Sequence, residues 1–189
     1  MEHVSIKIFA AGDTSNVRFS DAIPVFHRWI QSRDLPEMLI DVADYSHVPA
    51  GPGVVLIGHQ ANYGLDNAHN RPGLLYSRKS ASDLTGSESL KQAYDSALKA
   101  SRRLEAEPEF QGKLSFDPSQ LEITLNDRLL YPNTDAGWKS VEPALNVFLD
   151  GLYGAGAYSL ARSSDPRERL SVLVGRLSRA AWGLQAPPA

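Results

Sequence analysis

The sequence predicts an α+β fold, in which a mostly antiparallel sheet has three helices packed on one face. Two observations lead to this class. Three segments carry apolar residues at helical spacing, and the other apolar segments are short alternating runs that pair around turn residues. Such hairpins require antiparallel pairing, and the helices between them need an apolar sheet face to cover.

The N-terminal part of the chain predicts a strand, a helix and a hairpin. Apolar and polar residues alternate over 4–8, which is typical of a strand with one buried face. A helix is expected over 23–34, because Pro24 is tolerated in a first helical turn. Two extended segments follow at 38–48 and 54–60. The Pro/Gly-rich residues between them predict the turn of a hairpin.

The rest of the chain repeats the order of a helix followed by strands. The expected elements are an exposed polar loop (62–73), a short strand (74–76), a helix (87–104), a hairpin (114–125), a helix (133–154) and a last hairpin (158–174). This order suggests an α-β-β internal repeat, and the alternative is that an α+β domain has this order by chance.

No low-complexity linker divides the chain, so one domain is expected over 1–177. The segment 178–189 loses periodicity and ends in Ala-Pro-Pro-Ala, which predicts a flexible C-terminal tail. Trp182 in this tail is a candidate contact for a partner.

Composition excludes several classes of function. The 189 residues are 42% hydrophobic and 22% charged, which is typical of a soluble globular protein. The net charge is −3 without basic clusters, which argues against nucleic-acid and membrane partners. The absence of cysteine excludes disulfides, thiolate catalysis and Cys-ligated metals. Neither a signal peptide nor a membrane-spanning run is recognised, so a cytoplasmic location is expected.

The first candidate site lies in the predicted hairpin. If Ala43 lies opposite His59, then Asp41, Tyr45, His47 and His59 share one face of the sheet. Imidazoles beside a carboxylate suit general base catalysis or a divalent metal. The register is left open, because a shift of one residue moves His59 to the other face. The alternative is that these histidines are structural or surface residues. Because their spacing matches no metal motif, no metal site is predicted, and any cofactor is left unknown.

A second set of residues is predicted to bind a ligand. His59 follows a buried strand, at the point where a rigid scaffold meets the expected loop, and sites are often built at such points. Tyr63 and Asp66 lie in that loop, and His27 lies on the first helix, one position off its apolar stripe. The ligand-binding candidates are therefore His59, Tyr63, Asp66 and His27.

Three segments, 24–30, 41–47 and 51–59, resemble a family of bacterial proteins that has no assigned function. The resemblance covers roughly the first 80 residues of the chain. It implies no activity, cofactor or substrate.

The function expected from these observations is that of a cytoplasmic, non-catalytic domain that binds a small ligand or a protein partner, because no complete catalytic constellation is present. The alternative is a small hydrolase or lyase that uses Asp41, Tyr45, His47 and His59. Whether the protein is an enzyme, and whether it forms a homo-oligomer, is left open.

Overall fold

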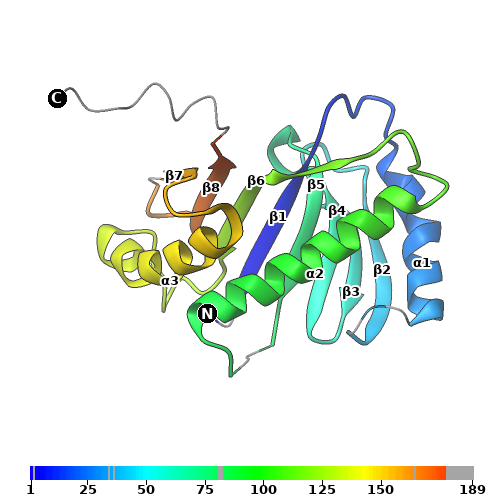
Figure 1. Ribbon diagram of the computed structural model, residues 1–189. Helices are drawn as coiled ribbons and strands as arrows, with labels where there is room; N and C mark the ends of the chain where they lie inside the picture. Colours follow the sequence, from blue (N-terminus) through cyan, green and yellow to red (C-terminus); the bar gives the residue numbers. More distant parts are fainter. Residues whose placement is uncertain (2, 34, 36, 81–82, 164, 178–189) are drawn as a thin grey trace.

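A computed structural model describes residues 1, 3–33, 35, 37–80, 83–163 and 165–177. Eight strands form one sheet, every neighbouring pair of strands is antiparallel, and three α-helices cover one of its faces (Figure 1). The predicted α+β class and the mostly antiparallel sheet are confirmed. The predicted tail and Trp182 lie outside the described residues.

The elements follow one another along the chain as β1 (Val4–Ala10), α1 (Ala22–Ser32), β2 (Leu39–Tyr45), β3 (Gly53–Gly58), β4 (Ala61–Asp66), β5 (Gly73–Arg78), α2 (Gly86–Ala106), β6 (Phe116–Leu125), α3 (Asp135–Tyr153), β7 (Tyr158–Arg162) and β8 (Leu170–Arg176). The strand order in the sheet is β2-β3-β4-β5-β1-β6-β8-β7. The first strand therefore lies in the middle, between β5 and β6.

The core lies between the sheet and the three helices. Helix α1 packs on β2 and β3, α2 crosses β1 and β5, and α3 contacts β8 (Figure 1). The alternate residues Val4, Ile6 and Ile8 of β1 are fully buried on this side, and so is Trp29 of α1. No helix in the described ranges is long and apolar enough to cross a bilayer. We call the opposite face of the sheet, which none of the α-helices in the described residues covers, the open face.

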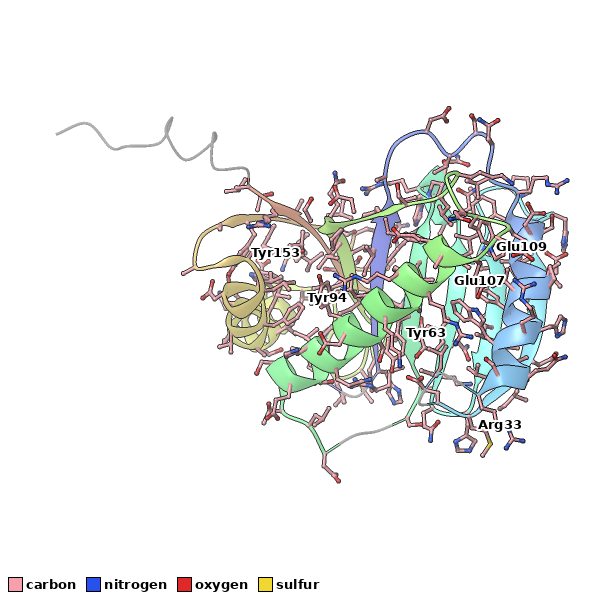
Figure 2. All side chains as sticks on the ribbon, turned by 45° about the vertical axis from the view of Figure 1, so that its right-hand side comes forward. Arg33, Tyr63, Tyr94, Glu107, Glu109 and Tyr153 are labelled. Carbon is pink, nitrogen blue, oxygen red and sulfur yellow. The ribbon has the colours of Figure 1, made fainter. Side chains whose placement is uncertain are left out.

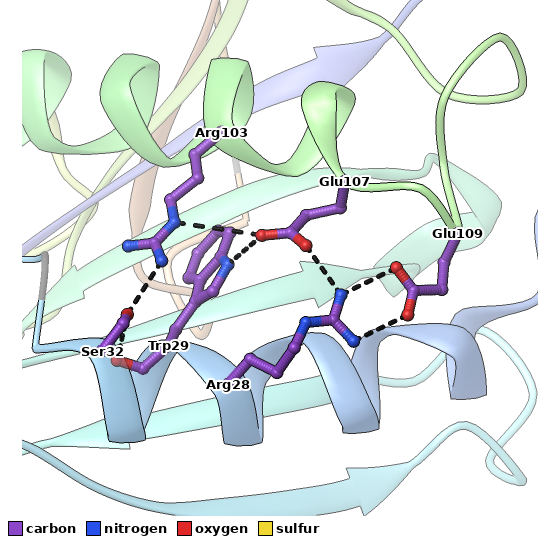
Figure 3. Close-up of polar contacts among 6 residues, drawn as sticks. All are labelled: Arg28, Trp29, Ser32, Arg103, Glu107 and Glu109. Carbon is purple, nitrogen blue, oxygen red and sulfur yellow. Dashed lines mark hydrogen bonds and ion pairs between the residues drawn. The ribbon is translucent and has the colours of Figure 1, made fainter.

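A polar cluster joins α1 to the end of α2 (Figure 3). Arg28 donates to both oxygens of Glu109 at 2.8 Å and to Glu107 at 2.7 Å. The indole N–H of the buried Trp29 donates to the other oxygen of Glu107 at 2.6 Å, and the Arg103 guanidinium lies 4.6 Å from the Trp29 ring. The hydrogen bonds from Arg28 hold the pKa of Glu109 below its ordinary value.

Two predicted elements were wrong. The expected loop over 62–73 contains β4, because Ala61, Tyr63 and Leu65 alternate with smaller or polar residues and are buried under the helices. A connection at 59–60 reverses the chain between β3 and β4.

The expected hairpin over 114–125 is the single strand β6. Pro118 falls where the pairing of β6 with β1 is irregular, between Phe116 and Leu121, and proline is tolerated at such points in a sheet. The three helices are therefore followed by four strands, one strand and two strands. The α-β-β internal repeat is not confirmed.

Candidate binding site on the open face of the sheet

The hairpin of β2 and β3 separates the two histidines of the first candidate site. Ala43 pairs with Val55, four residues away from the expected partner His59. His47 therefore lies beyond the end of β2, and His59 lies beyond the opposite end of the hairpin, where its backbone N–H donates to the Met38 carbonyl at 2.8 Å. The observed register therefore differs from the one that would bring the two histidines together, and the sequence alone does not fix which residues close the turn.

Asp41 and Tyr45 do share one face of β2, because they pair with Ile57 and Gly53, which are four positions apart on β3. Both side chains are exposed. Six residues of β3 separate the two ends of the hairpin, roughly 17 Å at about 3.4 Å for each step. The four candidates for catalysis therefore do not converge on one point.

The predicted ligand-binding residues are also dispersed. Tyr63 faces the helices, with its ring 5.2 Å from that of Tyr76, and burial, with a smaller contribution from Glu37, raises its pKa well above the ordinary range (Figure 2). Asp66 lies three residues further along the same strand, on the open face. His27 and His59 are exposed on other elements. Asp66 alone among the four belongs to the site that we describe next.

A buried ion pair lies in the middle of the open face. The ammonium of Lys7 in β1 pairs with Asp66 in β4, and their side chains are 3% and 5% exposed. Gly73 lies between them in the sheet, and a Cβ atom at this position would approach the Cε of Lys7 to 2.8 Å. The strand β5 thus contributes a glycine at the point where the lysine side chain crosses it.

A separate chain of hydrogen bonds runs across the sheet beside this pair. The hydroxyls of Ser5 and Ser77 lie 2.7 Å apart, and the Asn126 amide donates to Ser5 at 2.8 Å. Arg169 in turn donates to the oxygen of Asn126 at 2.7 Å. On the next pair of strands, Ser171 donates to Glu122 at 2.9 Å. Polar side chains therefore cover the open face from β5 to β8.

Three adjoining cavities of about 660, 310 and 280 Å³ form a groove along this face. The first two share His69, Glu122, Thr124 and Arg169, and the first and third share Ala161 and Leu173. We call this continuous surface the open-face groove. It runs from the connection between β4 and β5, over Lys7, to β8 and β7.

The groove is positively charged, although the chain as a whole has a net charge of −3. Seven lysine and arginine residues line the three cavities against three aspartate and glutamate residues, a surplus of four positive charges. The cations are Lys7, Arg71, Arg128, Arg162, Arg167, Arg169 and Arg176, and the acids are Asp66, Glu122 and Glu168.

Two of these arginines are engaged at the rim. Arg162 pairs with Asp135 at 2.7 Å and Arg167 with Asp165 at 2.8 Å, and each pairing lowers the pKa of the aspartate. By contrast, Arg71, Arg128 and Arg169 have no carboxylate partner among the residues that the structure describes.

The arginines without carboxylate partners are suited to binding oxyanions. Arg71 lies 3.8 Å from the centre of the Phe9 ring, which holds its guanidinium plane, and Arg169 is oriented by Asn126. A guanidinium presents paired N–H donors that match a carboxylate or a phosphate. Within the described ranges, no three histidine, aspartate or glutamate side chains are close enough to hold a metal ion.

Sequence reasoning missed most of this site. The alternation over 4–8 places Lys7 on the polar face of the first strand but does not predict that it is buried, and 167–169 falls within the expected last hairpin (158–174). A signal was nevertheless present: Ser5 and Lys7, and Glu122 and Thr124, are polar residues two positions apart, and Asn62 and Asp66 are four positions apart on the same face.

Comparison with known protein families and with curated proteins finds no match for this chain. The assignment of a function therefore rests on the groove itself.

Proposed function

We propose that this protein is a non-catalytic, cytoplasmic binding domain whose open-face groove receives an acidic segment of a protein partner. The observation that carries the proposal is the presence of Arg71, Arg128 and Arg169 along one groove without carboxylate partners of their own within the described residues. Carboxylates of a partner would form charge-assisted hydrogen bonds with them.

The shape of the groove favours an extended segment over a small ligand. Small-molecule sites are mostly apolar cavities that enclose the ligand. The open-face groove is instead lined by many charged and hydroxyl-bearing side chains and consists of three joined cavities along several strands. Leu173, which is 37% exposed on its floor, adds an apolar contact of the kind found in protein interfaces.

Charge alone would also attract a nucleic acid, but the side chains of the groove favour a protein. Proteins that bind single strands stack the bases on exposed aromatic rings. Among the described residues lining the three cavities, Phe9 is the one phenylalanine, tyrosine or tryptophan, and it is 5% exposed and already covered by Arg71.

The alternative function, a hydrolase or lyase that uses Asp41, Tyr45, His47 and His59, has less support. Its two histidines lie at opposite ends of a hairpin, and a general base must lie within hydrogen-bond reach of the group that it serves. Self-association stays a prediction that the test below also measures, through the dependence of the spectra on protein concentration.

The test is a titration of the protein with a short poly-glutamate peptide, followed by backbone amide NMR spectra. We expect shifts in residues of the groove and binding that weakens as salt is added. Arg128→Ala and Arg169→Ala should each lower the association constant roughly two- to fivefold, which corresponds to about 0.5–1 kcal/mol for an exposed ion pair.

The matched control is Arg102→Ala, because Arg102 is exposed on α2, on the other side of the sheet. An equal loss of affinity in Arg102→Ala would show that binding depends only on the net charge of the protein, and it would refute the site. The same titration is carried out with a single-stranded oligouridine of similar charge. If it binds the same residues more tightly than the peptide, the partner is a nucleic acid and not a protein.

A further inference from the structure

The connection between β4 and β5 holds two consecutive residues in a left-handed backbone conformation. His69 has φ 60° and ψ 23°, and Asn70 has φ 55°. Asparagine and histidine are found in this conformation more often than other residues with a Cβ atom, but both adopt it at a cost that glycine does not have. Strained backbone of this kind persists where the surroundings impose it, and it is concentrated at functional sites.

The surroundings of this connection do impose the conformation. At its start, the Ala68 N–H donates to the Asp66 carboxylate at 3.1 Å, and the Asn67 N–H donates to the Gly51 carbonyl at 3.1 Å. At its end, the Pro72 carbonyl accepts from the Ala10 N–H at 2.9 Å. The loop is therefore fixed to β1, to the buried ion pair and to the turn between β2 and β3.

This conformation brings His69 onto the groove. His69 is exposed, and it lines both of the cavities that meet over Glu122 and Thr124, where Arg169 lies as well. Its imidazole makes no hydrogen bond or ion pair with any residue in the part of the chain that the structure describes. Asn70, its neighbour in the same strained conformation, lines none of the three cavities.

We infer that His69 is a ligand-contacting residue of the open-face groove, and that the loop is strained in order to present it. Its imidazole N–H donates to a carboxylate oxygen of the bound acidic segment, in the stretch of groove that Arg169 also lines. This inference rests on the proposed function. It adds His69, which lies where two of the cavities meet, to the residues that contact the acidic segment.

The alternative is that the left-handed residues serve the chain reversal alone. Glycine distinguishes the two, because it adopts positive φ without steric cost. We therefore compare His69→Gly with Asn70→Gly. Both variants relieve the strain, but only the first removes the imidazole. The midpoint of urea unfolding and the association constant for the poly-glutamate peptide are measured for each.

We expect both variants to unfold at higher urea concentrations than the original protein. His69→Gly should bind the peptide two- to fivefold more weakly, whereas Asn70→Gly should bind it unchanged. In the original protein, the carbon-bound proton resonances of the His69 ring should shift as the peptide is added. A variant His69→Asn, which tolerates the left-handed conformation and keeps an N–H donor, should recover part of the binding.

Unchanged binding in His69→Gly, or an equal loss in Asn70→Gly, would overturn the inference. The outcome is separable from that of the proposed function. If Arg128→Ala and Arg169→Ala weaken binding while His69→Gly does not, the groove stands and the role of His69 fails. If none of these variants changes binding, both fail.

Discussion

Lys7 of β1 and Asp66 of β4 form a buried ion pair on the open face of the sheet. Removing two charges from water is costly, and the pair offsets this cost only through close contact and further hydrogen bonds, such as the one from the Ala68 N–H to Asp66. The pair lines the groove and fixes the loop that carries His69. It therefore connects the stability of the sheet to the geometry of the candidate site.

Removal of one partner of this pair is expected to be strongly destabilising. Lys7→Ala would leave Asp66 buried without its counter-ion, which should cost about 3–5 kcal/mol in the free energy of unfolding measured in urea. The double variant Lys7→Met/Asp66→Leu should recover most of that loss, because neither charge remains buried. A loss below about 1 kcal/mol in Lys7→Ala would show that the pair is solvated.

Glu107 is expected to hold α1 against the end of α2. Glu107→Ala would leave the buried indole N–H of Trp29 without its acceptor, at a cost of about 1–3 kcal/mol in unfolding free energy. Glu107→Gln keeps an acceptor and should cost less. Asp95→Ala removes an exposed pair with Lys91 and serves as the control, with an expected change below about 1 kcal/mol. An equal effect in the control variant would contradict this role.

Stability should fall in acid partly through Glu109. Because hydrogen bonds from Arg28 lower its pKa in the folded state, its ionised form stabilises the fold above the unfolded pKa of about 4.3. This contribution is lost as the pH falls through the lowered folded pKa. The unfolding free energy of Glu109→Gln should therefore fall less steeply below about pH 5 than that of the original protein. Parallel curves would refute the assignment.

His59→Ala is expected to be nearly silent. The side chain is exposed, and the hydrogen bond at this position comes from its backbone N–H. Stability should change by less than about 0.5 kcal/mol, and binding of poly-glutamate should not change. Loss of binding in His59→Ala would show that the peptide binds at the hairpin of β2 and β3 and not in the open-face groove.

The sequence predicts the parts of the fold that depend on local periodicity. The helices over 22–32, 86–106 and 135–153 and the last hairpin were found close to their expected bounds. The sequence analysis misses β4 because Asn62, Gly64 and Asp66, on its open face, are residue types that are common in loops. Their period of two was the correct signal, and the turn-rich composition concealed it.

The candidate site could not be predicted because its residues are brought together by pairing between distant strands. Lys7 meets Asp66 across β5, and Asn126 meets Arg169 across a separation of more than forty residues. Periodicity places each residue on a face but says nothing of which strand lies beside which. The register of a hairpin is set by its turn. Because Ala43 pairs with Val55 instead of His59, the histidines of the first candidate site lie apart.

The central position of β1 has a consequence for how the chain folds. Ser5 pairs with Ser77 on one side and with Thr124 on the other, so β1 keeps at least one unpaired edge until both later strands have been synthesised. Contacts between residues so distant in sequence form slowly, and unpaired edges invite association with other chains. Strands β2 to β5, which follow one another along the chain, can pair first. A nascent chain therefore completes its sheet, and with it the groove, only after Arg176 at the end of β8 has left the ribosome.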